Sequence, residues 1–214
     1  MATPIRNRYR THVRDEVKRA ALRQLAEGGP PALSINAIAK ELGVSGPALY
    51  RYFAGRDELL TELVVDAYDD LGEAIDDAAA RTRGRPARDR LRAFARAYRD
   101  WATTQPHRYG LLFAEPIPGY DAHAQRLIDA SRRAMNVLVD VLGDEDAEVP
   151  PAALRRELER WARSRAIDVD APVALRAVQV WARLHGFVSL EIGGNFTSMG
   201  LDPEKLFRAE LQQL

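Results

Sequence analysis

Residues 34–53, which read SINAIAKELGVSGPALYRYF, constrain the fold of this chain more than any other segment. Ser34 stands where a helix N-cap belongs, and Gly43 stands where a glycine can end a helix in a left-handed turn. Between them, the apolar positions recur at the spacing of one helical face: Ile35, Ile38, Ala39 and Leu42. The pattern predicts a short amphipathic helix followed by a glycine turn.

A second short helix is predicted over Gly46–Tyr52. Ser45 can cap this helix, and Pro47 fits its first turn, where no backbone donor is needed. Leu49 points to the core, whereas large polar side chains remain outside at Tyr50, Arg51 and Tyr52. Two such helices around a glycine turn form a helix-turn-helix, whose second helix enters the DNA major groove. The pattern also occurs in other all-α proteins, but core packing alone does not explain a helix only about 10 Å long.

The net charge alone argues against a nucleic-acid partner, because 31 Lys and Arg balance 31 Asp and Glu. The distribution of charge reverses that argument. Residues 1–56 hold ten basic and four acidic side chains, so the rest of the chain carries the compensating negative charge. A basic N-terminal part on an acidic remainder is what a local phosphate-binding face requires.

The N-terminal quarter resembles the TetR family of bacterial transcriptional regulators. The resemblance lies in Ile38-Ala39, Leu42-Gly43-Val44-Ser45, Pro47-Ala48-Leu49-Tyr50-Arg51-Tyr52-Phe53 and Arg56-Asp57-Glu58-Leu59-Leu60. Many relatives have His and Lys at the positions of Tyr52 and Arg56. The resemblance implies a DNA-binding regulator, most often a repressor. We expect Gly46 and Pro47, which open the second helix, to belong to the DNA-binding surface, with Ser45, Tyr50 and Arg51 at or near base edges. We expect phosphate contacts from Ser34, Lys40, Tyr52 and Arg56.

The remainder of the chain keeps an apolar period near 3.6 residues, without lasting strand alternation, which predicts an all-α fold. Residues 1–10 are expected to form a basic arm, with a disordered tail as the alternative. We expect a DNA-binding domain at 1–55 and an effector-binding and dimerisation domain at 56–214. Helices are predicted at 11–27, 56–80, about 91–104, 121–142, 152–165, 171–192 and 203–214. A further short helix is predicted to begin at residue 105. Loops are predicted at 116–120 and 143–151.

Two oppositely charged segments follow one another after residue 60. Seven acids lie between Glu62 and Asp77, and eight arginines lie between Arg81 and Arg99. Such runs usually form solvated faces. Pairing of the two segments across neighbouring helices is the alternative, although exposed pairs contribute only about 0–1 kcal/mol each.

The strings RYGLLFAEPIPGY and WARLHGFVSLEIGGNF resemble a C-terminal variety of the same family that is named for its Trp, His and Gly. The resemblance implies a homodimer held by two C-terminal helices of each subunit, which would read a near-palindromic operator. The helix at 171–192 would supply Ala182, Gly186 and Ser189 for close approach. A fully buried core helix of a monomer is the alternative.

The resemblance also implies a pocket for an unknown small-molecule effector. Its candidate lining residues are Tyr98, Trp101, Tyr109, Phe113, Trp181 and His185, each of which could instead be ordinary core. No catalytic motif or metal-ligand spacing is present, so we expect no enzyme activity, cofactor or metal. Without cysteine, a spanning segment or a signal peptide, the chain is expected in the cytoplasm. A helical ligand binder or enzyme that does not bind DNA is the rival interpretation.

Overall fold

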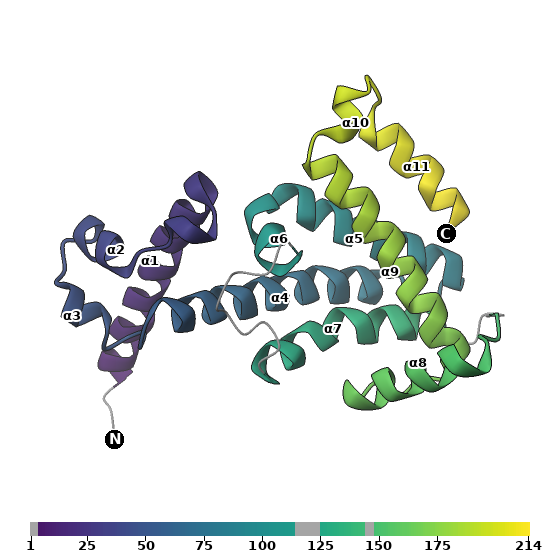
Figure 1. Ribbon diagram of the computed structural model, residues 1–214, viewed down its shortest axis with the longest axis horizontal. Helices are drawn as coiled ribbons and strands as arrows, with labels where there is room; N and C mark the ends of the chain where they lie inside the picture. Colours follow the sequence, from purple (N-terminus) through teal and green to yellow (C-terminus); the bar gives the residue numbers. More distant parts are fainter. Residues whose placement is uncertain (1–3, 114–124, 144–147) are drawn as a thin grey trace. The chain divides into compact units, whose positions relative to one another are not determined.

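The computed structural model describes residues 4–113, 125–143 and 148–214 as helices and turns, with no β-strand among them (Figure 1). This confirms the all-α prediction. The loops predicted at 116–120 and 143–151 lie wholly or partly outside the described residues. Within the described ranges, no helix combines the length and the apolar character needed to cross a lipid bilayer.

The described residues group into two compact units, and helix α4 (Arg56–Arg81) runs from the first into the second. The N-terminal unit contains the described residues up to Ala67 together with His107–Phe113, which belong to α6 (Pro106–Phe113). The C-terminal unit contains Tyr68–Pro106 and the described residues from 125 onward. The predicted boundary at residue 55 separates the expected DNA-binding domain from the expected effector-binding domain. It does not describe the compact units, and it stays a prediction.

The N-terminal unit is built from α1 (Pro4–Gly28), the 3₁₀ turn η1 (Pro30–Ala32), α2 (Ile35–Glu41), α3 (Gly46–Leu49) and the start of α4. Its core includes Val17, Ala20, Leu25, Ile38, Leu49, Phe53, Leu59, Leu60 and Leu63. The predicted arm is wrong for residues 4–10, because α1 begins at Pro4. Pro4 fits a first helical turn, and no Gly or further Pro interrupts the helix before Gly28.

The C-terminal unit contains the second half of α4 with α5 (Ala87–Thr104), α7 (Gln125–Leu142), α8 (Ala152–Ser164), α9 (Ala171–Ile192), α10 (Asn195–Ser198) and α11 (Pro203–Gln213). Asp170 caps α9 by accepting a hydrogen bond from Val173 N–H at 3.0 Å. The helix ends at Ile192 with Gly193 at its C-cap, and Gly194 is left-handed with φ +73°. Since α9 packs on α5, α7, α8 and α10, it is the central helix of this unit.

The two charged segments bind other helices rather than each other. Among the described residues no ion pair joins them. On the acidic segment, Asp66 pairs with Lys18 of α1 and Asp76 with Arg133 of α7. On the basic segment, Arg90 pairs with Asp140 of α7. Among the described residues, the two segments therefore do not pair with each other. Several of their charged side chains form ion pairs with neighbouring helices and are not only solvated.

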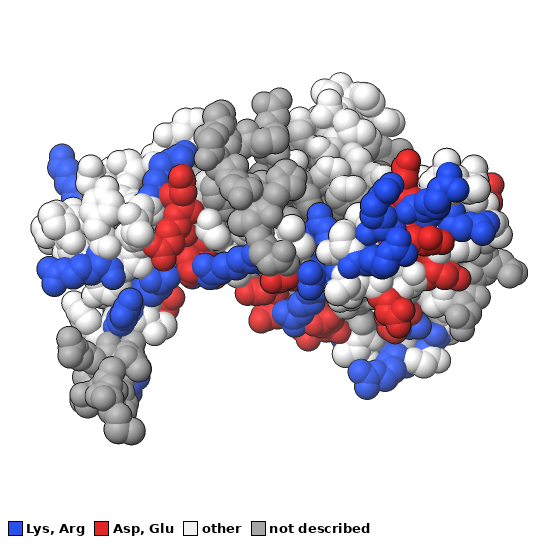
Figure 2. Space-filling model, turned by 60° about the horizontal axis from the view of Figure 1, so that its bottom comes forward, with Lys and Arg blue, Asp and Glu red and all other residues white. Residues whose placement is uncertain are grey.

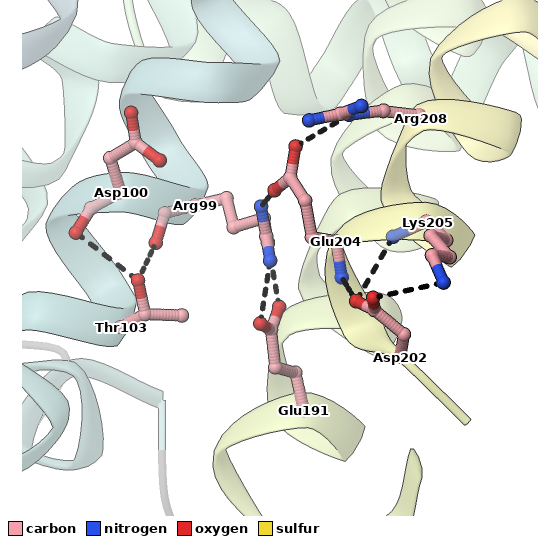
Figure 3. A network of polar contacts seen from close by, with 8 residues as sticks. All are labelled: Arg99, Asp100, Thr103, Glu191, Asp202, Glu204, Lys205 and Arg208. Carbon is pink, nitrogen blue, oxygen red and sulfur yellow. Dashed lines mark hydrogen bonds and ion pairs between the residues drawn. The ribbon is translucent and has the colours of Figure 1, made fainter. Parts of the chain in front are cut away.

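Arg99 of α5 ties three helices of the C-terminal unit together (Figure 3). Only 9% of Arg99 is exposed. Its guanidinium donates two hydrogen bonds to the Glu191 carboxylate of α9, at 2.7 and 2.8 Å, and one to Glu204 of α11. Its Cζ also lies 4.6 Å from the centroid of the Phe207 ring. The bidentate pairing and the ring contact fix the C-terminal helix against α5 and α9.

This cluster predicts a pH dependence of stability. Hydrogen bonds from Arg99, and then from Arg208, hold the pKa of the Glu204 carboxyl below its usual value of 4.5. The ionised carboxylate therefore stabilises the fold at neutral pH, and that stabilisation is lost as the pH falls through the lowered pKa. We expect Glu204→Gln to lower Tm at neutral pH and to flatten the loss of Tm on acidification. Circular dichroism melts across a pH series measure this, and a variant with the parent's acid slope would contradict the assignment.

Candidate DNA-binding surface

Helix α2 is closed at both ends by local contacts that the sequence predicted. Ser34 Oγ accepts a hydrogen bond from Ala37 N–H at 3.3 Å, and Ser34 N–H donates to Gln24 Oε1 at 2.9 Å. At the other end, Gly43 has φ +67°, and Val44 N–H donates to Ala39 O at 3.0 Å. These bonds determine where the chain leaves α2 and where α3 begins.

The recognition segment, Gly46–Tyr52, is not one continuous α-helix, so that prediction is wrong in its length. Helix α3 ends at Leu49 and a turn follows. Tyr52 N–H donates to Leu49 O at 2.8 Å, a three-residue bond that tightens the chain. The tightening returns Phe53 to the core, where its side chain is 1% exposed.

Two large polar side chains of the recognition segment are exposed and available to a partner. Tyr50 is 50% exposed, and Arg51 is also exposed. Tyr52 is half-buried and packs against the N-terminal core. Ser45 is exposed and holds the N-cap position without a side-chain cap bond, so its predicted capping role is wrong. The surface therefore divides between Tyr50 and Arg51, which are outward, and Tyr52, which also supports the fold.

The start of α3 is closely fitted to α2. Pro47 is exposed in the first turn of α3. A Cβ at Gly46 would lie 3.0 Å from Oδ1 of Asn36, which is tighter than ordinary contact. Gly46 therefore lets the recognition segment begin close against α2, and its predicted place in the DNA-binding surface, like that of Pro47, stays a prediction.

The predicted phosphate contacts differ in their surroundings. Lys40 is exposed in the last turn of α2. Arg56 is half-buried: one guanidinium nitrogen donates to Pro30 O at 2.7 Å, and another lies 3.5 Å from Asp57 Oδ1. Arg56 therefore also joins the start of α4 to η1. The N-terminal unit, at the left of Figure 2, carries Lys and Arg side chains on several sides of a largely uncharged surface.

Sequence reasoning missed Arg14 of α1. Its guanidinium donates to the carbonyl oxygen of Tyr52, and its Cζ lies 4.4 Å from the centroid of the Phe53 ring. A third contact reaches Glu62 Oε2 of α4 at 3.1 Å. No local sequence signal marks this role, since the hydrogen-bonded residues are 38 positions apart.

The six candidate pocket residues are divided between the two units. Tyr109 and Phe113 belong to the N-terminal unit, where their ring centroids are 5.0 Å apart. The other four belong to the C-terminal unit: Tyr98, Trp101, Trp181 and His185. Their role as effector contacts stays a prediction.

Within the C-terminal unit, Tyr98, Trp181 and His185 lie together. The rings of Trp181 and His185 stack with centroids 5.4 Å apart, and the Tyr98 hydroxyl lies 3.5 Å from His185 Nδ1. Burial lowers the pKa of His185, because a buried imidazole loses the hydration of its charged form. His185 is therefore a neutral partner in an α5–α9 contact at neutral pH.

Trp101 lines a surface hollow of about 480 Å³ between α4 and α5. Its indole Nε1 donates to Asp70 Oδ2 at 3.0 Å. The lining also includes Glu73, Asp77, Arg81 and Asp100. Among the described residues, no three His, Asp or Glu side chains come together as metal ligands.

Helix α9 has an exposed, uncharged face. Ala182 and Ser189 are exposed, and Gly186 is half-buried between them along the helix. Neighbouring positions expose apolar side chains, with Trp181 37% and Leu190 47% exposed. A Cβ built on Gly186 meets no atom within 4 Å. In the single chain, α9 is therefore not buried on all sides.

Comparison with known proteins defines the class. Residues 19–63 match a family model described as bacterial regulatory proteins of the tetR family, and residues 91–214 match one described as tetracyclin repressor-like, C-terminal domain. The helix-turn-helix and the helical body are thus those of a DNA-binding transcriptional regulator. The chain belongs to the TetR family, as its sequence predicted.

Relatives and solved structures agree with this assignment. The chain is 34% identical to the HTH-type transcriptional regulator Rv1816 of Mycobacterium tuberculosis, over 96% of this chain and 92% of that protein. It is 43% identical to the crystal structure of SCO4313, described as a regulatory protein, with a TM-score of 0.83 over 99% and 98% of the two chains. FadR of Bacillus subtilis, solved with stearoyl-CoA, shares the fold alone: 16% identity and a TM-score of 0.62 over 92% and 95%.

Proposed function

We propose that the protein is a homodimeric, cytoplasmic repressor without enzyme activity, released from a near-palindromic operator by a small molecule. The observation that carries the proposal is that the recognition segment buries some of its side chains and exposes others. Leu49 and Phe53 fill the core, while Tyr50 and Arg51 between them face outward. A stable fold does not need these two large polar side chains outside, but readout of base edges in a major groove does.

The division of roles at residue 55 belongs to the same proposal. Residues 1–55 hold the DNA surface, in which Ser45, Tyr50 and Arg51 contact bases. Ser34, Lys40, Tyr52 and Arg56 contact phosphates. Residues 56–214 hold the effector site and the dimer interface, where the exposed face of α9 meets its copy. The exposure of Ala182 and Ser189 around Gly186 supports that choice of helix face.

The effector would act through α4, because this helix starts directly after the recognition segment and ends in the C-terminal unit. Trp101 is the pocket candidate with the strongest support, since it lines a hollow whose other side is α4. The structure of FadR with stearoyl-CoA is an example of this fold holding a ligand. To change DNA affinity, the effector must bind the released state more tightly than the DNA-bound state.

Selection from a random duplex library tests the proposal against its rival, a helical ligand binder without DNA function. We expect enrichment of a near-palindrome whose half-sites are about 34 Å apart, or a multiple of that spacing. Affinity for the enriched duplex, called the operator below, should exceed that for a scrambled duplex by about 10³-fold or more. Equal affinities across a salt titration would reject a sequence-specific regulator.

The sharpest single substitution on the DNA surface is Tyr50→Ala. Half of this side chain is exposed, so its loss should leave the fold intact. We expect operator affinity to fall about 10- to 100-fold, in line with about 1–3 kcal/mol for a good base contact, in a fluorescence anisotropy titration. Thermal unfolding should match the parent, as in the control variant Tyr9→Ala, which removes another exposed tyrosine of the same unit. Parent-like operator affinity in a folded Tyr50→Ala protein would remove this residue from the DNA surface.

A further inference from the structure

Arg14 makes three different contacts at the base of the recognition segment. It donates a hydrogen bond to the carbonyl oxygen of Tyr52, covers the face of Phe53 and pairs with Glu62 of α4. Both charged partners are largely shielded, with 23% of the Arg14 side chain and 13% of the Glu62 side chain exposed. One planar guanidinium of α1 thus contacts both the turn after α3 and the second turn of α4.

The carbonyl of Tyr52 is where the recognition segment ends. Carbonyls at such ends lack an intrahelical partner, so a side-chain donor decides how the turn is held. Phe53 is anchored in the core directly after this carbonyl. The Arg14 contact therefore fixes the last peptide of the segment that displays Tyr50 and Arg51, without occupying either of those side chains.

Glu62 links this contact to a series of ion pairs between α1 and α4. Its Oε2 also lies 3.1 Å from Lys18 Nζ, and Lys18 reaches Asp66 Oδ2 at 2.8 Å. A shift of α4 against α1 would change the position of Glu62, and with it the guanidinium that holds Tyr52. The recognition segment is thus coupled to α4 through a side chain as well as through the chain itself.

We propose that Arg14 is a positioning residue of the DNA surface, which sets the conformation of the recognition segment and links it to α4 through Glu62. The inference rests on the proposed function and adds to it a residue that acts without contacting DNA. Lysine cannot replace it, because a point-like ammonium cannot bond the carbonyl, cover the ring and pair with the carboxylate together.

The test compares Arg14→Lys, Arg14→Gln and Glu62→Gln, with Arg19→Gln as a matched control. Arg19 lies on the same helix, where it pairs with exposed Glu16 and donates to the Asp15 carbonyl one turn earlier. The first readout needs no DNA: hydrogen exchange of the segment 49–55 in the free, full-length protein. We expect faster exchange in all three variants and parent-like exchange in the control, while α9 exchanges as in the parent.

The second readout is the ratio of operator affinity to scrambled-duplex affinity. Arg14→Lys keeps the charge, so we expect an unchanged salt slope and scrambled-duplex affinity, but a specificity ratio lowered about tenfold. Parent-like exchange and specificity in Arg14→Lys would overturn the proposal. So would equal losses on both duplexes with a smaller salt slope in Arg14→Gln, which would make Arg14 a phosphate contact. If the parent itself preferred no duplex, the proposed function would fail, and the exchange data would still decide the role of Arg14.

Discussion

Gly186→Leu is expected to turn the protein into folded monomers and to lower operator affinity by about 100-fold or more. Gly186 lies on the exposed face of α9, and a Cβ there meets no atom of the described residues within 4 Å. The added side chain is therefore tolerated within one protomer. The same side chain is not tolerated between two closely packed copies of α9, because it would clash with the partner helix. A symmetric interface repeats this clash in both subunits. Sedimentation velocity measures the change directly.

A matched control separates this effect from a loss of stability. Gly110 also lies in a helix, and among the described residues no atom lies within 4 Å of an added Cβ, so Gly110→Leu should remain dimeric. Both variants replace a helical glycine with a better helix former, so neither should weaken the folded protomer itself. In Gly186→Leu the Tm should lose only the dependence on protein concentration that dimerisation gives the parent. A dimer that persists in Gly186→Leu would move the interface to another face.

Arg99→Met is expected to lower the free energy of unfolding by about 3–5 kcal/mol. Arg99 is 9% exposed, and the side chain of its partner Glu191 is 13% exposed. Methionine fills much of the same volume but leaves the Glu191 carboxylate without its bidentate donor. Urea unfolding at a fixed protomer concentration measures the loss, since association would otherwise change the apparent stability.

Two further variants show whether the loss comes from the buried pair. Arg183→Met removes an ion pair with Glu210 whose side chains are 39% and 24% exposed, and such a pair is worth about 0–1 kcal/mol. The double variant Arg99→Met with Glu191→Leu should recover most of the lost stability, because it removes the unpaired charge as well. A single Arg99→Met variant no less stable than Arg183→Met would show that the cluster does not secure α11.

The elements that the sequence predicted well are those coded by neighbouring residues. The cap at Ser34, the left-handed Gly43 and the inward Leu49 each depend on contacts within a few positions. Helix α9 was predicted with its observed bounds because its apolar face is long and both of its ends carry strong signals. The outward Tyr50 and Arg51 followed from the same local periodicity.

The errors arise where distant residues decide the outcome. The recognition helix was predicted too long because the return of Phe53 to the core, which tightens the turn, is a tertiary requirement. Arg14 and Arg99 were overlooked because their carbonyl and carboxylate partners are 38, 92 and 105 positions away. Eight arginines in one segment look alike in sequence, and only packing distinguishes the one that is buried. For the same reason, aromatic residues at helical spacing could not be sorted between the two units.

The half-buried placement of Tyr52 has a consequence for redesigning the operator preference. Positions 50 and 51 can be randomised freely, since neither supports the hydrophobic interior. At position 52 every replacement alters the packing of the core and the proposed phosphate contact at once. In a library screened for new target sequences, selection at this position will therefore act first on whether the protein folds. Retargeted variants should therefore accumulate changes at 50 and 51 and retain an aromatic ring at 52.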